Sequence, residues 1–213
     1  MTATSAHDST RVYLLRHGEC EGGQIFRGHT DSAPTEAGQN LVLARLNSLA
    51  GISLAAVISS PAQRCRLAAE AFASDRALPF VNEQNFLEIY FGQWEGQLVA
   101  DVADRMPTET SQFWRDPLSY TPPMGEALLA FQARVIQGWQ NLLAQYRGQT
   151  VVLVTHGGVI RMILADVLAM PLRPLSHLAV PHGCLSCIQF HHAEGQPDWP
   201  QLLFHNGQVG DDY

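Results

Sequence analysis

The chain has 213 residues, of which 46% are hydrophobic and 15% charged, with a formal net charge of −7. These values favour a single domain over residues 1–213 with one sizeable core. The excess of 20 acidic over 13 basic residues argues against a nucleic-acid partner, and no apolar run is long enough to predict a membrane partner. Residues 1–10 are polar and lack a signal-peptide pattern; we expect a flexible tail. The missing signal-peptide pattern and the four cysteines of the chain together predict a reduced, cytoplasmic protein.

The first predicted strand is the apolar run at residues 12–15, which ends in Arg16-His17-Gly18. An arginine beside an imidazole is costly inside a buried strand. At the carboxyl end of a parallel strand the same pair opens into a crevice where ligands bind. Arginine offers a planar set of donors that suits phosphate, and histidine offers a nucleophilic or proton-carrying nitrogen. This stretch therefore predicts a phosphoryl-transfer centre.

The next elements alternate between helix and strand. A helix is expected from Thr35 to about Leu49, a strand at residues 55–58, and a second helix after Ser59-Ser60-Pro61 that carries Arg64 near its start. A third strand is expected at residues 80–87. Irregular, proline-rich sequence follows, and we interpret residues 92–124 as a mostly helical insertion or cap within the domain.

The second half begins with the clearest helix, at about residues 125–146, where apolar residues recur at three- and four-residue steps. A buried strand at residues 151–154 ends in His156-Gly157-Gly158, and a helix follows at 159–168. Two later strands are expected at residues 185–190 and 201–204. The alternation predicts the α/β class, as a three-layer α/β/α sandwich with a mostly parallel sheet.

Three of these strands end in polar residues at a strand-to-helix junction. Because the carboxyl ends of parallel strands share one edge of a sheet, Arg16-His17, Ser60 with Arg64, and His156 are expected to converge. Helix N-termini at the same edge add free N–H groups and a positive dipole, both favourable to a phosphate.

The ordered set of motifs resembles the histidine phosphatase superfamily, the phosphoglycerate mutase-like group. The matching stretches are Leu15-Arg16-His17-Gly18-Glu19, Ser59-Ser60-Pro61 with Arg64, Glu88 with Phe91-Gly92 and Trp94-Glu95-Gly96, and Thr155-His156-Gly157-Gly158. They span most of the chain in the order of the family. The resemblance implies a metal-independent phosphatase of small phosphate monoesters with no cofactor, and it allows a homodimer.

The resemblance also implies a role for each matching residue. His17 would attack phosphorus and become a phosphohistidine, and Glu88 would protonate the leaving oxygen and then help water attack the intermediate. The phosphoryl oxygens would be held by Arg16, Arg64, His156 and Gly157. Arg27 and Glu126 are candidate substrate contacts, although each could equally form an ordinary surface salt bridge. No metal ligand is predicted, since Cys184 and Cys187 lie in an expected strand without a second cysteine pair.

Within the superfamily the sequence most resembles the α-ribazole phosphatases of cobalamin biosynthesis. The stretches that carry this likeness are Arg27-Gly28-His29-Thr30-Asp31, Trp114-Arg115-Asp116-Pro117 and the proline-rich entry to Gly125-Glu126. A phosphoglycerate mutase is less favoured, because Gly23 stands where the family often has a substrate-binding asparagine. A broad-specificity sugar-phosphate or phosphohistidine phosphatase remains an alternative, and a phospholigand-binding module is the alternative outside enzymes.

Overall fold

The computed structural model describes residues 9–173 and 177–210, and these contain one six-stranded sheet. The strand order is β3-β2-β4-β1-β5-β6. The strands are β1 (Ser9–Arg16), β2 (Ala56–Ser59), β3 (Phe80–Asn82), β4 (Thr150–Thr155), β5 (Leu185–His191) and β6 (Trp199–His205). The first four run parallel, whereas β5 is antiparallel to both β1 and β6. The predicted mostly parallel sheet is confirmed.

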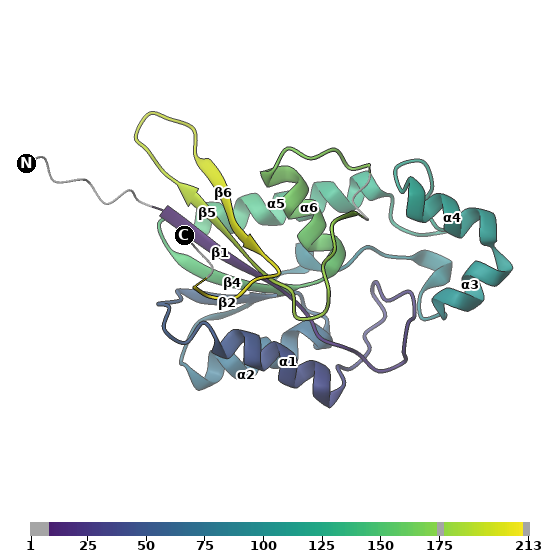
Figure 1. Ribbon diagram of the computed structural model, residues 1–213, viewed down its shortest axis with the longest axis horizontal. Helices are drawn as coiled ribbons and strands as arrows, with labels where there is room; N and C mark the ends of the chain where they lie inside the picture. The colour runs from purple at the N-terminus through teal and green to yellow at the C-terminus, as the bar shows by residue number, and fades with distance from the viewer. Residues whose placement is uncertain (1–8, 174–176, 211–213) are drawn as a thin grey trace, which may run out of the picture.

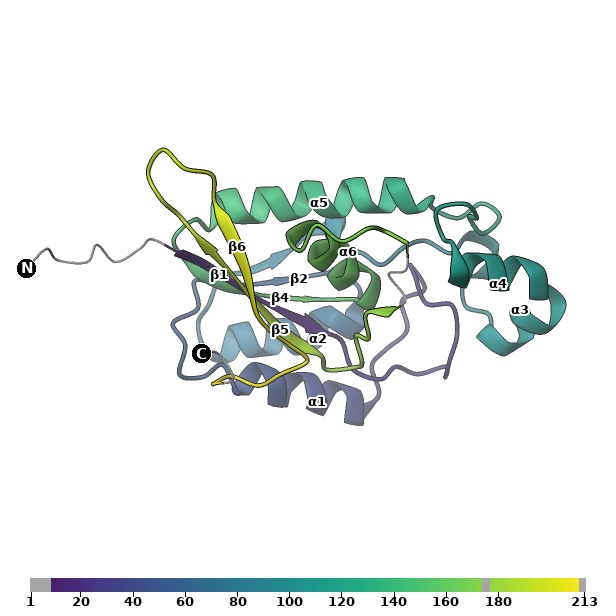
Figure 2. The ribbon, with the colours of Figure 1, turned by 45° about the horizontal axis from the view of Figure 1, so that its top comes forward.

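Helices cover both faces of the sheet, which gives the predicted three layers (Figures 1 and 2). One layer contains α1 (Glu36–Asn47) and α2 (Gln63–Asp75), and the other contains α5 (Leu128–Gln145) and α6 (Gly157–Val167). Alternate side chains of β1 enter the two cores: Val12 and Leu14 pack on the α5–α6 side, and Tyr13 and Leu15 on the α1–α2 side. No helix in the described part of the chain is both long and apolar enough to cross a membrane.

Two expected elements differ from the structure. The strand expected at residues 80–87 ends at Asn82, and a 3₁₀ turn, η1 (Gln84–Phe86), follows. The Glu83 side chain accepts a hydrogen bond from the Asn85 N–H, which favours a turn over a continued strand. The expected tail extends two residues too far, because Ser9 and Thr10 belong to β1; residues 1–8 lie outside the described residues.

The segment at residues 92–124 is largely helical, as expected. It contains the turn η2 (Gly92–Trp94) and the helices α3 (Val99–Arg105) and α4 (Pro107–Arg115), which lie beyond the carboxyl ends of the parallel strands (Figure 1). Its apolar residues Trp94, Val102 and Phe113 form a third, smaller core with Phe26 from the loop between β1 and α1. This lobe therefore lies over the edge of the sheet where the polar junctions end.

Candidate active site

The sheet register places the three polar junctions side by side. Arg16 at the end of β1 pairs with Thr155 at the end of β4, and Ser59 at the end of β2 pairs with Val154. The backbone N–H of His17 donates to the carbonyl of Thr155 at 3.0 Å, which continues the ladder one residue past the strand. Because β1, β4 and β2 are neighbours in the sheet, the predicted convergence of their carboxyl ends is observed.

His17 is buried at this edge and holds its imidazole in one orientation. Its Nδ1 lies 2.7 Å from the carbonyl oxygen of Gly18. A carbonyl only accepts, so Nδ1 carries the proton and Nε2 keeps a free lone pair. Burial, reinforced by the charges of Arg64 and Arg16, holds the pKa of His17 well below its usual value. The ring is therefore neutral at pH 7, and Nε2 is available as a nucleophile.

The loop that follows His17 packs against the start of α1 through two glycines. A Cβ on Gly18 would lie 2.1 Å from the carbonyl oxygen of Gly38, and a Cβ on Gly38 would lie 2.1 Å from that of Glu19. Each clash would be with backbone, which cannot rotate away. The Thr35 side chain caps α1 by accepting from the Gly38 N–H at 3.0 Å. The loop after His17 is thus fixed against the first helix.

Arg64 and His156 lie against His17 from within the protein. The rings of His17 and His156 are 5.3 Å apart. Arg64 Nε donates to Nδ1 of His156 at 3.3 Å, so the proton of His156 lies on Nε2, which contacts the Ser60 hydroxyl at 2.7 Å. Terminal nitrogens of Arg64 also donate to the carbonyls of Arg27, Gly28 and Thr30. Arg64 therefore connects the loop at residues 27–30 to the two histidines.

Arg16 and Arg161 flank Gly157 at the N-terminus of α6. A Cβ on Gly157 would lie 3.3 Å from Nη1 of Arg161 and 3.4 Å from Nε of Arg16. Arg16 Nη1 donates to the Val180 carbonyl at 2.5 Å, while its buried Nε has no partner among the described residues. Two guanidinium groups and the first N–H groups of α6 together create a positive corner suited to an anion.

Glu88 lies against the same helix start. Its carboxylate accepts from the Gly158 N–H at 2.9 Å and from the Ile89 N–H at 3.0 Å. A Cβ on Gly158 would come within 2.1 Å of Glu88 Oε1, so glycine is required for this contact. In its ionised form Glu88 favours the charged forms of Arg16 and Arg161, and thus opposes the lowering of their pKa values by burial.

These groups open into a cavity of about 270 Å³. Its polar lining includes Arg16, His17, Arg27, Glu88 and Arg161, with the backbone of Gly157 and Gly158. Its remaining wall is apolar and comes from several elements: Ile25, Phe26, Ile89, Phe91, Val99, Phe113, Trp114, Pro117, Leu128, Phe131 and Met162. The cavity therefore has a charged end at the strand termini and an aromatic end beneath α3 and α4.

The predicted site residues occupy three kinds of position. Arg27 lines the cavity, and one of its terminal nitrogens donates to the carbonyls of Glu21 and Gly23. Arg64 and His156 lie behind the lining. Glu126 is not part of the lining, because Arg134 binds both of its carboxylate oxygens, at 2.7 and 2.8 Å. The structure thus gives Glu126 a largely buried ion pair, whereas the alternative left open from the sequence was a surface salt bridge.

Sequence reasoning missed two residues at the site, Arg161 and His182. Arg161 is four residues after Gly157 on α6, and residues at that spacing share a helix face, so the helical pattern contained a signal for it. The His182 ring lies 5.4 Å from that of His17. It arrives there because β5 pairs antiparallel with β1, which places the residues before Leu185 beside the loop after Leu15. The sequence contained no clear signal for that pairing.

The two buried neutral histidines predict acid sensitivity of the fold. The pKa values of His17 and His156 are well below 6.5 in the folded state, so the unfolded chain binds more protons below that pH. The stability they contribute is complete above pH ~6.5 and is lost as the pH falls towards their folded pKa values. We expect the free energy of unfolding to decrease by up to about 1.4 kcal/mol per pH unit for each histidine.

Urea unfolding of the wild type and of His17→Gln at pH 7.5, 6.5 and 5.5 measures this effect. The variant is expected to show a shallower decrease, because one of the contributing histidines is gone; His182, whose pKa burial lowers to about 4, contributes in both proteins. Equal slopes in both proteins would contradict the assignment to His17.

The chain is similar to known proteins over most of its length. The family model described as the histidine phosphatase superfamily (branch 1) matches residues 12–200. A bifunctional protein of Mycobacterium tuberculosis is 35% identical over 185 residues, which are 85% of this chain and 50% of that protein. This chain thus spans about half the length of that relative. The adenosylcobalamin/α-ribazole phosphatase of Escherichia coli is 28% identical over 183 residues, 85% of this chain and 90% of the enzyme.

Solved structures agree with these sequence matches. YhfR of Bacillus stearothermophilus superposes with a TM-score of 0.85 at 27% identity, covering 95% of this chain and all of that one. The α-ribazole phosphatase of Shigella flexneri superposes with a TM-score of 0.80 at 26% identity, covering 92% and 96%. With a family model over most of its length and the family's motifs gathered at one edge of the sheet, the chain belongs to the histidine phosphatase superfamily.

Proposed function

We propose that this protein is a phosphatase that hydrolyses a small phosphate monoester through a phosphohistidine on His17. The observation that supports this most directly is the neutral His17 imidazole, with Nδ1 bonded to the Gly18 carbonyl and Nε2 free, at the charged end of a cavity. Arg16 and the N-terminus of α6 would bind the phosphoryl oxygens, and the positive charge of Arg64 lies behind them. A binding module would need these groups but would not need an acid such as Glu88.

The reaction proceeds in two balanced steps. Nε2 of His17 bonds to phosphorus while the bond from phosphorus to the ester oxygen breaks, and that oxygen takes a proton from the Glu88 carboxyl group. Water then attacks phosphorus and gives its proton to the Glu88 carboxylate, the phosphorus–nitrogen bond breaks, and inorganic phosphate leaves. The enzyme returns to its starting protonation state.

The favoured substrate is α-ribazole 5′-phosphate, a ribose phosphate that carries a dimethylbenzimidazole base. The wall opposite the charged end supports this choice, because Phe26, Phe91, Phe113 and Trp114 provide flat apolar surface for an aromatic base. A phosphoglycerate has a second charged group and no apolar part, so it would leave that wall unused. The similarity to the E. coli and S. flexneri enzymes supports the same substrate class.

The proposal is tested by kcat/KM on α-ribazole 5′-phosphate, 2- and 3-phosphoglycerate, and several sugar phosphates, each with and without a chelator. We expect the highest value for α-ribazole 5′-phosphate and no effect of the chelator. Equal values on all substrates would remove the cobalamin assignment and favour a broad-specificity phosphatase. Interconversion of the two phosphoglycerates without release of phosphate would identify a mutase.

Trp114 provides a sharper test of the aromatic wall. This side chain on α4 is 49% exposed, lines the cavity, and stacks on Phe26 with ring centroids 6.1 Å apart and planes at 17°. We expect Trp114→Ala to lower kcat/KM for α-ribazole 5′-phosphate by about tenfold, the upper range for loss of one aromatic pair. Ribose 5-phosphate, which lacks the base, should change by less than about twofold, since it makes no such contact.

Trp199→Ala is the matched control, because Trp199 is an exposed tryptophan on β6, 66% accessible and outside the cavity lining. Its substitution should leave both substrates unaffected. An equal loss on both substrates in Trp114→Ala would show that the wall does not bind the base.

A further inference from the structure

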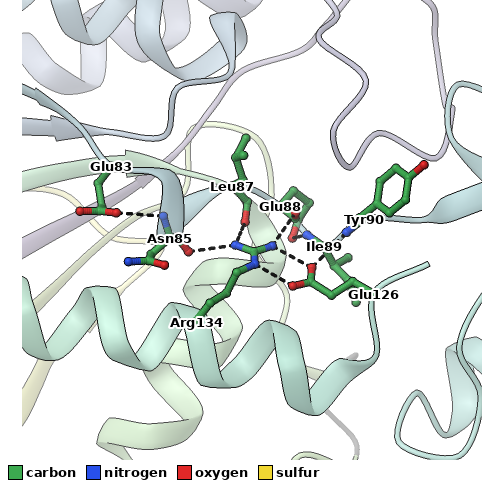
Figure 3. Close-up of polar contacts among 8 residues, drawn as sticks. All are labelled: Glu83, Asn85, Leu87, Glu88, Ile89, Tyr90, Glu126 and Arg134. Carbon is green, nitrogen blue, oxygen red and sulfur yellow. Dashed lines mark hydrogen bonds and ion pairs between the residues drawn. The ribbon is translucent and has the colours of Figure 1, made fainter. Parts of the chain in front are cut away.

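Arg134 on α5 holds the backbone of the segment that carries Glu88. Its Nη1 donates to the carbonyls of Asn85 at 2.9 Å and Leu87 at 2.8 Å, and its Nη2 donates to the carbonyl of Glu88 at 2.9 Å. One guanidinium therefore binds three carbonyls within four residues of chain, and Figure 3 shows them converging on it. A loop that follows a short strand lacks the backbone hydrogen bonds of a sheet. The hydrogen bonds from Arg134 satisfy its carbonyl groups instead.

Glu126 completes the arrangement from the other side. Its carboxylate accepts from Nε and Nη2 of Arg134 and from the N–H of Tyr90 at 3.2 Å, and its own N–H donates to the Tyr90 carbonyl at 2.8 Å. The ion pair is largely buried, with side-chain exposures of 22% for Arg134 and 17% for Glu126. Residues 85–90 are thus held at both ends, by Arg134 before Glu88 and by Glu126 after it (Figure 3).

The Glu88 carboxylate depends on this backbone for its position. It is bound by the N–H of Gly158 and by the N–H of its own neighbour Ile89, so its orientation follows that of the loop. We propose that Arg134, with Glu126 as its counter-ion, is the positioning residue for Glu88. The inference rests on the proposed role of Glu88 as the proton donor to the leaving oxygen.

The chemistry of the pair explains the residue types. A guanidinium has five N–H donors in a plane and can serve three carbonyls and a carboxylate together, whereas an ammonium has three donors around a point. Glu126 neutralises the charge that Arg134 brings into a largely buried site. The guanidinium also lies over the Phe131 ring at 4.8 Å, and Phe131 lines the cavity.

The test uses leaving groups that differ in their need for an acid. Phenolate from 4-nitrophenyl phosphate leaves without a proton, whereas the alkoxide of ribose 5-phosphate needs one. The value of kcat/KM includes only the steps up to formation of the phosphoenzyme. The ratio of kcat/KM for the two substrates therefore reports on proton donation to the leaving oxygen, and not on later hydrolysis of the phosphoenzyme. The variants are Arg134→Met, Arg134→Lys and Glu126→Gln. Glu88→Gln is the reference for loss of the acid, and Arg66→Met is the control for loss of an exposed arginine paired with Glu70.

We expect Arg134→Met to lower kcat/KM on ribose 5-phosphate by about 10- to 30-fold, since a small displacement of a catalytic group is costly. On 4-nitrophenyl phosphate it should fall less than about threefold, because the acid is not needed there. Arg134→Lys and Glu126→Gln should show the same selective loss of kcat/KM, but a smaller one. If Arg134→Met does not fold, these two variants test the positioning role of Arg134. Arg66→Met should match the wild type.

An equal loss on both substrates, or no loss, overturns the positioning role. If Glu88→Gln shows the selective loss and the Arg134 and Glu126 variants do not, this inference fails while the proposed function stands. If Glu88→Gln itself shows no selective loss, the proposed acid is wrong and the inference falls with it.

Discussion

His17→Ala is expected to abolish hydrolysis, with kcat lowered by at least about 10⁴-fold, because loss of a covalent nucleophile removes the pathway and not one contact. The ring is buried, so its removal leaves a small cavity beside His156, and the fold should persist. The measurement is steady-state release of phosphate, together with trapping of the phosphoenzyme from a radiolabelled substrate in acid and in base. A phosphohistidine is lost in acid and survives base, unlike a phosphoserine.

His191→Ala is the matched control, since His191 lies at the far end of β5 from the site. It should keep wild-type turnover and labelling. Substantial turnover in His17→Ala, or label that survives in that variant, would contradict the nucleophilic role. Turnover by the wild type that a chelator abolishes would contradict the metal-independent mechanism.

Gly158→Ala is expected to give the second largest loss, about 10²-fold in kcat/KM on an alkyl phosphate, which is the lower range for removing a general acid. The new methyl group would lie 2.1 Å from Glu88 Oε1 and 3.0 Å from its carboxyl carbon, so the carboxylate must leave the Gly158 N–H that it now accepts from. The acid is then displaced, although its chemistry is unchanged.

A double-substitution cycle isolates this effect. In a Glu88→Ala background the clashing oxygens are absent, so adding Gly158→Ala should cost little more. Gly51→Ala is the control for the substitution itself, because a Cβ there meets nothing within 4 Å. Additive losses in the cycle would show that Gly158→Ala acts on something other than Glu88.

Most of the fold follows from local patterns in the sequence. The apolar runs at residues 12–15 and 151–154 are strands buried on both faces, and long helical spacing identified α5. The expected strand at residues 80–87 was too long because the apolar residues Phe86 and Leu87, which follow three polar residues, were included in it. There the capping bond from Glu83 and the burial of Phe86 against the core produce a turn instead. The spacing of apolar residues does not reveal such competition between a side-chain hydrogen bond and continued strand pairing.

The site was predictable where it depends on strand ends, and less so where it depends on loops. Arg16, His17 and His156 end neighbouring parallel strands, so topology alone brings them together. Spacing could not choose Glu88 over Glu83 or Glu95; the family resemblance made that choice. Arg134 was unpredictable for another reason. It stands on the edge of an amphipathic helix, and its partners are backbone carbonyls, which carry no sequence signature.

The close packing of Gly18 and Gly38 restricts which substitutions this protein can accept in the loop after His17. The backbone of Gly38 excludes a side chain at position 18, and the backbone of Glu19 excludes one at position 38. A second substitution at the obstructing residue would leave these backbone atoms in place, so neither glycine can be replaced without a shift of the backbone. Under the proposed function, substitutions that change the substrate are therefore expected at the other end of the cavity, where Trp114 and Val99 belong to a separate helical lobe.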